Sequence, residues 1–258
     1  MRVLFIGDVV GEAGRRGLET TMPMLRETHK PDLVVVNGEN AAGGVGITAD
    51  TAAEIYAAGA QVITLGNHAY RHADSFGYLD SEEALVRPLN HSDAAPGRGW
   101  TKVEAGGMRV AVVNLSGAVQ LQVDRNPFGA MDELLEDLDG LVDAVFVDFH
   151  AEVTSEKVAM GWYLDGRVAA VCGTHTHVPT ADARVLPGGT AFISDVGMTG
   201  SRASVLGVEA HDAIETLRTG LPHRFHTATE DVWVMGAVVE IRDDGSSAGI
   251  EQILQPCS

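Results

Sequence analysis

The segment 167–177 consists of Arg167-Val168-Ala169-Ala170-Val171-Cys172 followed directly by Gly173-Thr174-His175-Thr176-His177. Its first half is a short, continuous apolar run, which is typical of a strand buried on both faces of a sheet. Its second half places two histidines directly after that strand. A buried strand that ends in chemically active side chains is the pattern that recurs along the chain.

Four other segments repeat this pattern. The apolar runs 2–7, 32–36, 61–65 and 143–147 end in Asp8-Val9-Val10-Gly11, Asn37-Gly38-Glu39-Asn40, Gly66-Asn67-His68 and Asp148-Phe149-His150. Helical patterns over 15–30, 48–58, 131–138 and 154–164 lie between the runs, and Thr48 is placed to cap the second helix. Alternating strands and helices predict an α/β fold with parallel pairing.

The middle and the end of the chain contain strands without full helices between them. Gly106-Gly107 and Asp243-Asp244-Gly245 are hairpin signals, and the first separates predicted strands over 100–104 and 109–115. Further strands are expected over 190–194, 231–242 and 248–254. We therefore expect an α/β fold in which two sheets pack as a sandwich flanked by helices. Residues 1–258 are expected to form a single domain, because no break in composition marks a boundary.

The composition narrows the class of protein. The 258 residues carry 18 Lys and Arg against 36 Asp and Glu, a formal net charge of −18, and 45% are apolar. The apolar share is typical of a globular protein. The negative charge argues against binding to long nucleic acids and anionic membranes, since clustered basic side chains hold both. Two cysteines, an apolar N-terminal run that ends at Asp8 and the lack of a membrane-length apolar run lead us to expect a cytoplasmic protein.

Side chains that bind metal or phosphate gather at the carboxyl ends of the five predicted strands, where open α/β sheets bind ligands. Taken singly, an Asp or Asn there is more often a cap or turn residue, and a His is more often a hydrogen-bonded residue. The joint occurrence favours a site, because four of the ten histidines directly follow predicted strands. The candidates are Asp8, Glu39, Asn40, Asn67, His68, His150, His175 and His177.

The chemistry of these side chains indicates a metal centre. In an extended segment, residues i and i+2 point the same way, so His175 and His177 are expected to approach one site. Imidazoles, carboxylates and amide oxygens together suit iron, manganese or zinc better than magnesium or calcium. Three imidazoles, two carboxylates and two amides make seven ligands, which is more than one tetrahedral ion needs. With one carboxylate bridging, seven ligands can hold two ions. Two ions about 3.5–4 Å apart can clamp a phosphoryl group and activate a water. The residues therefore predict hydrolysis of a phosphate ester.

The same residues resemble the five metal motifs of the calcineurin-like metallophosphoesterases. The resemblance runs from Gly7-Asp8 to Gly173-Thr174-His175-Thr176-His177, and the later strands would complete that family's αββα sandwich. Val10 stands where the first motif usually has a histidine, and Glu39, followed by Asn40, replaces the usual bridging Asp. These departures resemble the YmdB-like subgroup. The resemblance implies a two-metal phosphodiesterase that hydrolyses a small phosphodiester, a cyclic nucleotide, by metal-activated hydroxide.

The resemblance also implies a role for each residue. Asp8, Glu39, Asn40 and His177 would hold one ion, and Glu39, Asn67, His150 and His175 the other, with Glu39 bridging. An amide oxygen from Asn40, in place of a histidine, favours iron first and manganese next over zinc, in the divalent or trivalent state. His68 matches the family's catalytic histidine, which would protonate the leaving oxygen or stabilise charge on the phosphate. The alternative is that His68 orients a ligand.

Some features and functions stay open. Arg15 and Arg16 either grip a phosphate or form a solvated helix start, and the solvated start is the better interpretation. The glycine-rich loop 41–46 lacks the lysine of a P-loop, and Cys172 is expected in the core. A phosphomonoesterase and a regulatory protein that binds a nucleotide or partner remain alternatives. The partner we expect is a small phosphodiester substrate, self-association is compatible with the class, and neither long nucleic acid nor membrane is expected.

Overall fold

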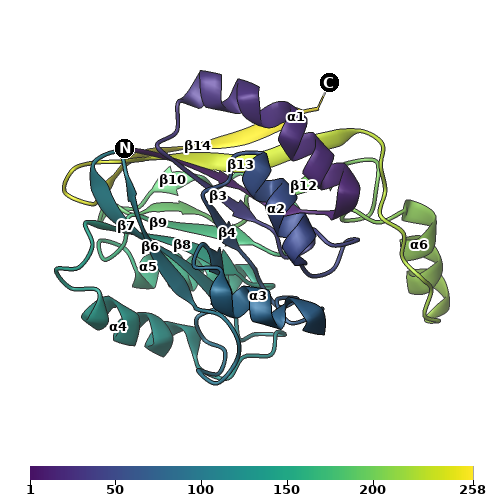
Figure 1. The fold of residues 1–258 in the computed structure, drawn as a ribbon, viewed down its shortest axis with the longest axis horizontal. Helices are drawn as coiled ribbons and strands as arrows, with labels where there is room; N and C mark the ends of the chain where they lie inside the picture. The colour runs from purple at the N-terminus through teal and green to yellow at the C-terminus, as the bar shows by residue number, and fades with distance from the viewer. Residues whose placement is uncertain (258) are drawn as a thin grey trace.

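The computed structural model of the protein describes residues 1–257. Two sheets pack face to face, and helices cover the outer face of each sheet (Figure 1). The predicted α/β class and the two-sheet sandwich are therefore confirmed. Among residues 1–257, no helix has the length and apolar character that a membrane span requires.

The first sheet has the strand order β2-β12-β13-β1-β3-β4-β5, and β14 pairs with β13. Its central strands β1, β3, β4 and β5 are parallel, whereas β13 is antiparallel to both β1 and β14. The bounds are β1 Arg2–Ile6, β2 Asp8–Val9, β3 Leu33–Asn37, β4 Val62–Thr64, β5 Leu85–Val86, β12 Met198–Ser201, β13 Val232–Ile241 and β14 Ser247–Pro256.

The second sheet has the order β10-β11-β9-β8-β7-β6, with β7, β8, β9 and β11 parallel. Gly106 and Gly107 join β6 to β7 with φ of 56° and 79°, the left-handed pair that a tight hairpin turn requires. The bounds are β6 Trp100–Ala105, β7 Met108–Ser116, β8 Ala144–His150, β9 Ala170–Thr174, β10 Arg184–Val185 and β11 Ala191–Ile193.

Apolar side chains fill the space between the two sheets and beneath the helices. Between the sheets, the rings of Phe5 and Phe146 meet edge to face at 5.2 Å, and Cys172 lies in the same core, as expected. Helices α1 and α2 cover the first sheet, and α4 and α5 cover the second. Burial of each large apolar side chain stabilises the fold by about 1.5–3 kcal/mol. This packing brings the carboxyl ends of the parallel strands of both sheets together.

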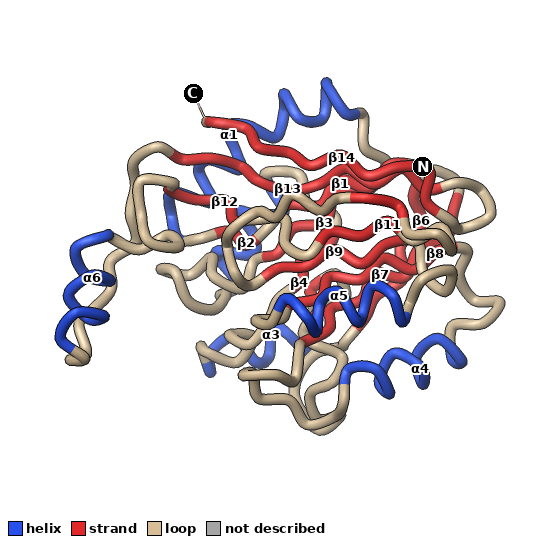
Figure 2. The backbone as a smooth tube through the Cα atoms, turned by 180° about the vertical axis from the view of Figure 1, so that it is seen from behind, coloured by secondary structure: helices blue, strands red, loops and turns tan. Residues whose placement is uncertain are grey.

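The four predicted helices are present and differ from their predicted bounds mainly at their starts, whereas the helices over 76–81 and 210–219 were not predicted. The helices are α1 Gly11–His29, α2 Ala49–Ala57, α3 Phe76–Ser81, α4 Pro127–Asp137, α5 Thr154–Tyr163 and α6 Ala210–Thr219, with a 3-10 turn, η1 Ala73–Ser75. Thr48 caps α2 through a reciprocal capping box with Thr51, as predicted. Helix α4 begins before the predicted start because the Asn126 side chain caps it and Pro127 occupies its first turn. Helix α6 stands away from the sandwich (Figure 2).

Candidate metal centre

The fold brings all eight candidate side chains into one connected cluster. The first sheet contributes Asp8 from β2 and the side chains after β3 and β4, and the second sheet contributes His150 at the end of β8 and both histidines after β9. The cluster therefore lies where the carboxyl ends of the two sheets meet. Its members are Asp8, Glu39, Asn40, Asn67, His68, His150, His175 and His177.

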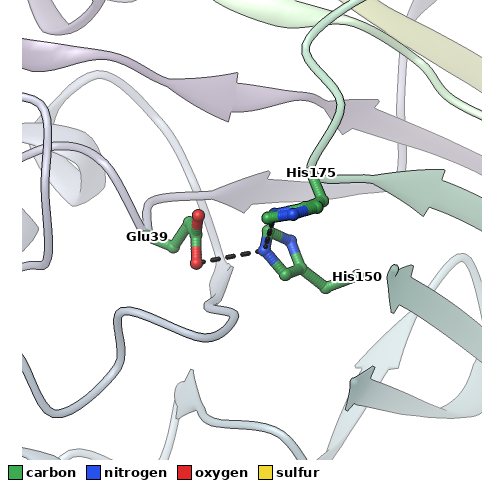
Figure 3. A group of neighbouring side chains, drawn as sticks. All are labelled: Glu39, His150 and His175. Atoms are coloured by element: carbon green, nitrogen blue, oxygen red, sulfur yellow. Dashed lines mark hydrogen bonds and ion pairs between the residues drawn. The ribbon is translucent and has the colours of Figure 1, made fainter. Parts of the chain in front are cut away.

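His150 is the hub of the cluster. Its Nε2 atom lies 3.1 Å from Glu39 Oε2, and 3.0 Å from both Asn67 Oδ1 and His175 Nδ1. Figure 3 shows Glu39, His150 and His175 turned toward one another. Because one ligand atom from each of these three residues lies within 4.8 Å of the others, a single cation could contact all three.

The surroundings of the Asp8 carboxylate show whether a cation fits this cluster. Its side chain is fully buried, and its Oδ1 atom has no hydrogen-bond partner among residues 1–257. That oxygen lies 3.8 Å from His150 Nδ1 and 3.9 Å from His177 Nε2. An unsatisfied buried carboxylate oxygen is costly, and a bound cation removes the cost. The donor set therefore fits a metal.

Two histidines are held in the orientation that frees a nitrogen for a metal. The hydroxyl of Thr174 donates to Asp148 Oδ1 at 2.7 Å, so His150 Nδ1 is the donor in its 2.9 Å bond to that hydroxyl oxygen. His177 Nδ1 donates to the Leu206 carbonyl at 2.9 Å. With Nδ1 occupied, the Nε2 lone pair of each ring is directed to the cluster.

The charges in the cluster shift its pKa values. Burial lowers the pKa of His150, but the Glu39 carboxylate outweighs burial and raises that pKa to about 9. Burial, followed by the charge of His150, lowers the pKa of His175 to about 3. Burial raises the pKa of Glu39, yet His150 and His68 hold it well below its ordinary value. Glu39 and His175 are thus in the protonation state of ligands, whereas His150 must release a proton when a metal binds.

Asn40 takes part in the cluster in an orientation that differs from the expected one. Its Nδ2 atom donates to Glu39 Oε1 at 3.0 Å and faces His177 Nε2 at 3.1 Å, while its Oδ1 atom lies 2.9 Å from His68 Nδ1. An amide binds cations through oxygen. Ligation by Asn40 therefore requires a half-turn of its amide, which would remove the contact with His68.

His68 lies at the open side of the cluster. Its Nδ1 atom is 2.9 Å from Asn40 Oδ1 and 3.2 Å from Glu39 Oε1, and its side chain is 35% exposed. The other histidines of the cluster are at most 17% exposed. His68 is therefore fixed at one nitrogen and accessible elsewhere, which suits a residue that meets a substrate.

The segment after β9 reaches the cluster by a bend, so the expected extended conformation is wrong. Strand β9 ends at Thr174, and His175 and His177 have φ of 94° and 63°. Such left-handed conformations cost about 1–3 kcal/mol each in residues other than glycine and are concentrated at functional sites. The two imidazoles converge because of these conformations rather than by alternation along a strand.

Two buried groups that fix this bend were not among the candidates. Asp195 Oδ2 accepts from Thr176 N at 3.0 Å and Thr176 Oγ1 at 2.7 Å, and Lys157 Nζ donates to it at 2.6 Å. Lys157 also donates to the Thr174 carbonyl at 2.7 Å. Asp195 follows a predicted strand, so the strand-end rule could have found it. Lys157 lies within a helix and has no such signal.

Asp148 is a second buried acid that the sequence interpretation left aside. Its Oδ2 atom accepts from Asn37 Nδ2 at 2.8 Å and from Thr64 Oγ1 at 2.6 Å, and its Oδ1 atom accepts from Thr174. Asp148 thereby links β3 and β4 of the first sheet to β8 and β9 of the second beneath the cluster. Both Asp148 and Asn37 lie in the strand-end motifs quoted above, so their position in the sequence could have marked them as part of the site.

The two arginines behave differently from each other. Arg15 is 14% exposed, donates to the Ala41 carbonyl and pairs with Glu54, so it ties α1 to α2 rather than forming a solvated helix start. Arg16 is 76% exposed and solvated, as expected. Among residues 1–257, neither arginine side chain makes a hydrogen bond or an ion pair with the cluster. Gly43, Gly44 and Gly46 give the 41–46 loop its turns through positive φ.

A two-sheet α/β sandwich with a cluster at the strand ends that could hold a cation defines the class of calcineurin-like metallophosphoesterases. Within that class, the family described as YmdB-like protein matches residues 4–253. The chain belongs to the YmdB-like family, and the resemblance drawn from the motifs is confirmed.

Known proteins resemble the chain over nearly its full length. A Bacillus subtilis (strain 168) protein named 2',3'-cyclic-nucleotide 2'-phosphodiesterase is 46% identical over 255 residues, 98% of this chain and 97% of the relative. A solved structure of a hypothetical protein from Thermus thermophilus matches with TM-score 0.94 and 40% identity over 100% of both chains. A Mycoplasma pneumoniae structure described as a novel phosphatase matches with TM-score 0.93 and 33% identity, over 99% of this chain and 93% of the other.

Proposed function

We propose that the protein is a metal-dependent phosphoric ester hydrolase that cleaves a small phosphodiester, with cyclic nucleotides as the substrate class. The observation that carries the proposal is the convergence of His150, Glu39 and His175 beside the unsatisfied buried oxygen of Asp8. The name of the Bacillus relative supports the substrate class, because the likeness covers almost all of both chains.

The proposed ligand sets share Glu39. Asp8, Glu39, Asn40 and His177 would hold one ion, and Glu39, Asn67, His150 and His175 the other. Glu39 is suited to bridging because Oε2 faces His150 at 3.1 Å while Oε1 faces Asn40 at 3.0 Å. The mixed nitrogen and oxygen donors favour iron first, manganese next and zinc last. When bound, two such ions would polarise the phosphoryl group and activate a water.

The protein's own residues then position the reaction. Asp8 and Glu39 would hold the cations that attract the phosphate, and the Thr174–Asp148 pair keeps His150 in the ligand orientation. We propose that His68, whose Nδ1 atom lies 3.2 Å from Glu39 Oε1, gives a proton to the leaving oxygen through its exposed edge. Glu39, one of the proposed metal ligands, thus also positions the imidazole of His68.

The cellular setting follows from the same features. Both cysteines are free thiols, Cys172 in the core and Cys257 half-buried, which suits a reducing compartment such as the cytoplasm. The net charge of −18 opposes long polyanions and leaves a small phosphodiester as the partner. Self-association is compatible with this proposal.

Turnover of a diester against a monoester tests the proposal. Protein supplied with manganese or iron(II) should hydrolyse bis(4-nitrophenyl) phosphate faster than 4-nitrophenyl phosphate. Asp8→Asn should abolish turnover, and the exposed substitution Asp139→Asn should not affect it. Faster hydrolysis of the monoester would instead indicate a phosphomonoesterase, and no turnover of either substrate by metal-loaded protein would indicate a binding role.

A further inference from the structure

A cavity of about 310 Å³ lies beside the candidate metal centre. Its walls are largely apolar and include Val178, Met198, Leu206, Trp233 and Met235. The volume falls at the lower end of the range of roughly 300–1,000 Å³ that small-molecule sites occupy. Val178 and Leu206 are 55% and 49% exposed, so the cavity opens to solvent through apolar side chains that a ligand would cover.

The cavity is joined to the metal centre at two points. His177 lines the cavity, while its Nε2 atom lies 3.1 Å from Asn40 Nδ2 and 3.9 Å from Asp8 Oδ1. Met198 lines it as well, and Met198 pairs with Asp8 in the parallel register of β12 and β2. Only the His177 side chain therefore separates a ligand in the cavity from a phosphate at the metal centre.

Arg202 gives the cavity its polar character. Its guanidinium lies 4.3 Å from the centroid of the Trp233 ring, and the described lining contains no acid to pair with it. Across residues 1–257, the Arg202 side chain makes neither an ion pair nor a hydrogen bond, so its N–H groups are available. A planar cation stacked on an indole, with apolar walls around it, suits a flat ring that has hydrogen-bond acceptors on its edge.

We propose that this cavity, the base pocket, binds the nucleobase of the substrate while the phosphate lies at the metal centre. The proposal rests on the proposed function and adds the part of the substrate that the pocket recognises. Leu206 connects the two regions, because its side chain forms a wall of the base pocket while its carbonyl accepts from His177. Arg202 and Leu206 are then specificity-determining residues.

Two cyclic phosphodiesters separate base recognition from hydrolysis. Adenosine 2',3'-cyclic phosphate carries a base, and glycerol 1,2-cyclic phosphate has the same five-membered ring without one. In Arg202→Met and Leu206→Ala, the ratio of kcat/KM for the nucleotide to that for the glycerol ester should fall roughly tenfold, through a higher KM for the nucleotide. Leu206→Ala keeps the carbonyl that His177 contacts. The matched control is Leu217→Ala on α6, where the side chain is 81% exposed, and its ratio should equal that of the unchanged protein.

Binding of adenosine to the metal-free protein gives a readout without turnover. Adenosine should quench the fluorescence of Trp233, and the quenching should disappear in Trp233→Phe and weaken in Arg202→Met. An unchanged substrate ratio in the pocket variants, or no quenching, overturns the base pocket while leaving hydrolysis intact. If the unchanged protein hydrolyses neither cyclic ester, the proposed function fails. Quenching of Trp233 fluorescence by adenosine then shows by itself whether the base pocket binds a nucleobase. Arg202→Met alters an exposed side chain, so it keeps the test decisive if Leu206→Ala does not fold, as circular dichroism would report.

Discussion

His68 is the residue of the cluster whose removal separates catalysis from metal binding. It contacts Asn40 and Glu39 through one nitrogen, and its side chain is 35% exposed. We expect His68→Ala to keep both metal ions and lose about 10²–10⁴-fold in kcat, which is the usual contribution of a general acid. Metal content and turnover should be measured on the same preparation. A parallel loss of metal and activity would assign His68 an orienting role instead.

His150 makes the stability of the metal-free protein depend on pH. Its folded pKa of about 9 lies above its ordinary value of 6.5, because Glu39 outweighs the effect of burial. The protonated ring therefore stabilises the fold fully below about pH 6.5, and that stabilisation is lost as the pH rises through about 9. The melting temperature in chelator should fall across this window.

The same melting series with metal added provides the comparison. A cation at Nε2 replaces the proton, so the metal-loaded protein should show a smaller fall between pH 6.5 and 9. His150→Gln should remove the trend that remains in chelator. An equal pH dependence in His150→Gln and the unchanged protein would contradict this assignment.

At the residue level, the sequence could predict the cluster but not its supports. The eight candidates each follow a strand of the predicted sheets, and the structure brings all of them together. The left-handed conformations of His175 and His177 could not be predicted, because they depend on Asp195 and Lys157, which are distant in sequence. The orientation of the Asn40 amide depends likewise on His68 and Glu39.

Among the elements, α5 and the segment after β11 control the bend that carries two candidate ligands. Lys157 and Asp195 are 3% and 1% exposed, and removal of one partner from a buried pair costs about 3–5 kcal/mol. We expect Asp195→Asn to lower the free energy of unfolding by a large part of this amount and to weaken metal binding. Urea unfolding and metal titration measure the two effects.

An exposed ion pair in the second sheet is the matched control. Asp143 pairs with Arg109 at 2.7 Å on the surface, where solvent screens the charges. Asp143→Asn should leave metal binding unchanged and stability almost unchanged. If Asp195→Asn destabilised the fold with no change in metal affinity, Asp195 would not position the bend.

Elements with strong local signals were predicted well, and elements set by tertiary contacts were not. The buried strands and α2, with its Thr48 cap, lie within a few residues of their predicted bounds. Strand β12 was not predicted because tertiary contacts define it. It pairs with β2 near the N-terminus on one side and with β13 near the C-terminus on the other. Helix α6 was not predicted either, although Ala213, Ile214 and Leu217 recur at helical spacing; in the structure this apolar face is largely exposed, because Ile214 and Leu217 are 54% and 81% exposed.

At the scale of the whole molecule, we propose that residues 1–258 form one domain. The core between the sheets interleaves side chains of both, as the contact of Phe5 with Phe146 shows. Trp233 lies in the first sheet and Trp100 in the second, so two variants that each keep one of them as the sole tryptophan, with Trp162 also replaced, report on each sheet separately. Their unfolding midpoints in urea should coincide. Two separate transitions would indicate two domains.

The net charge of −18 describes the whole molecule and does not set the charge of the candidate metal centre. Asp8 and Glu39 are the acids of the proposed ligand sets, and two divalent cations would more than neutralise them, so a positive centre would lie within an acidic shell. The shell disfavours long polyanions more than small phosphodiesters. The metal is therefore the feature on which the whole account of anion binding depends.

Metal content is the measurement that decides whether the cluster holds two ions. Protein purified without chelator should contain about two metal ions per chain by elemental analysis, with iron or manganese predominating, and Asp8→Asn should contain fewer. A folded protein with fewer than about one ion per chain after supply of iron or manganese would contradict the two-metal centre.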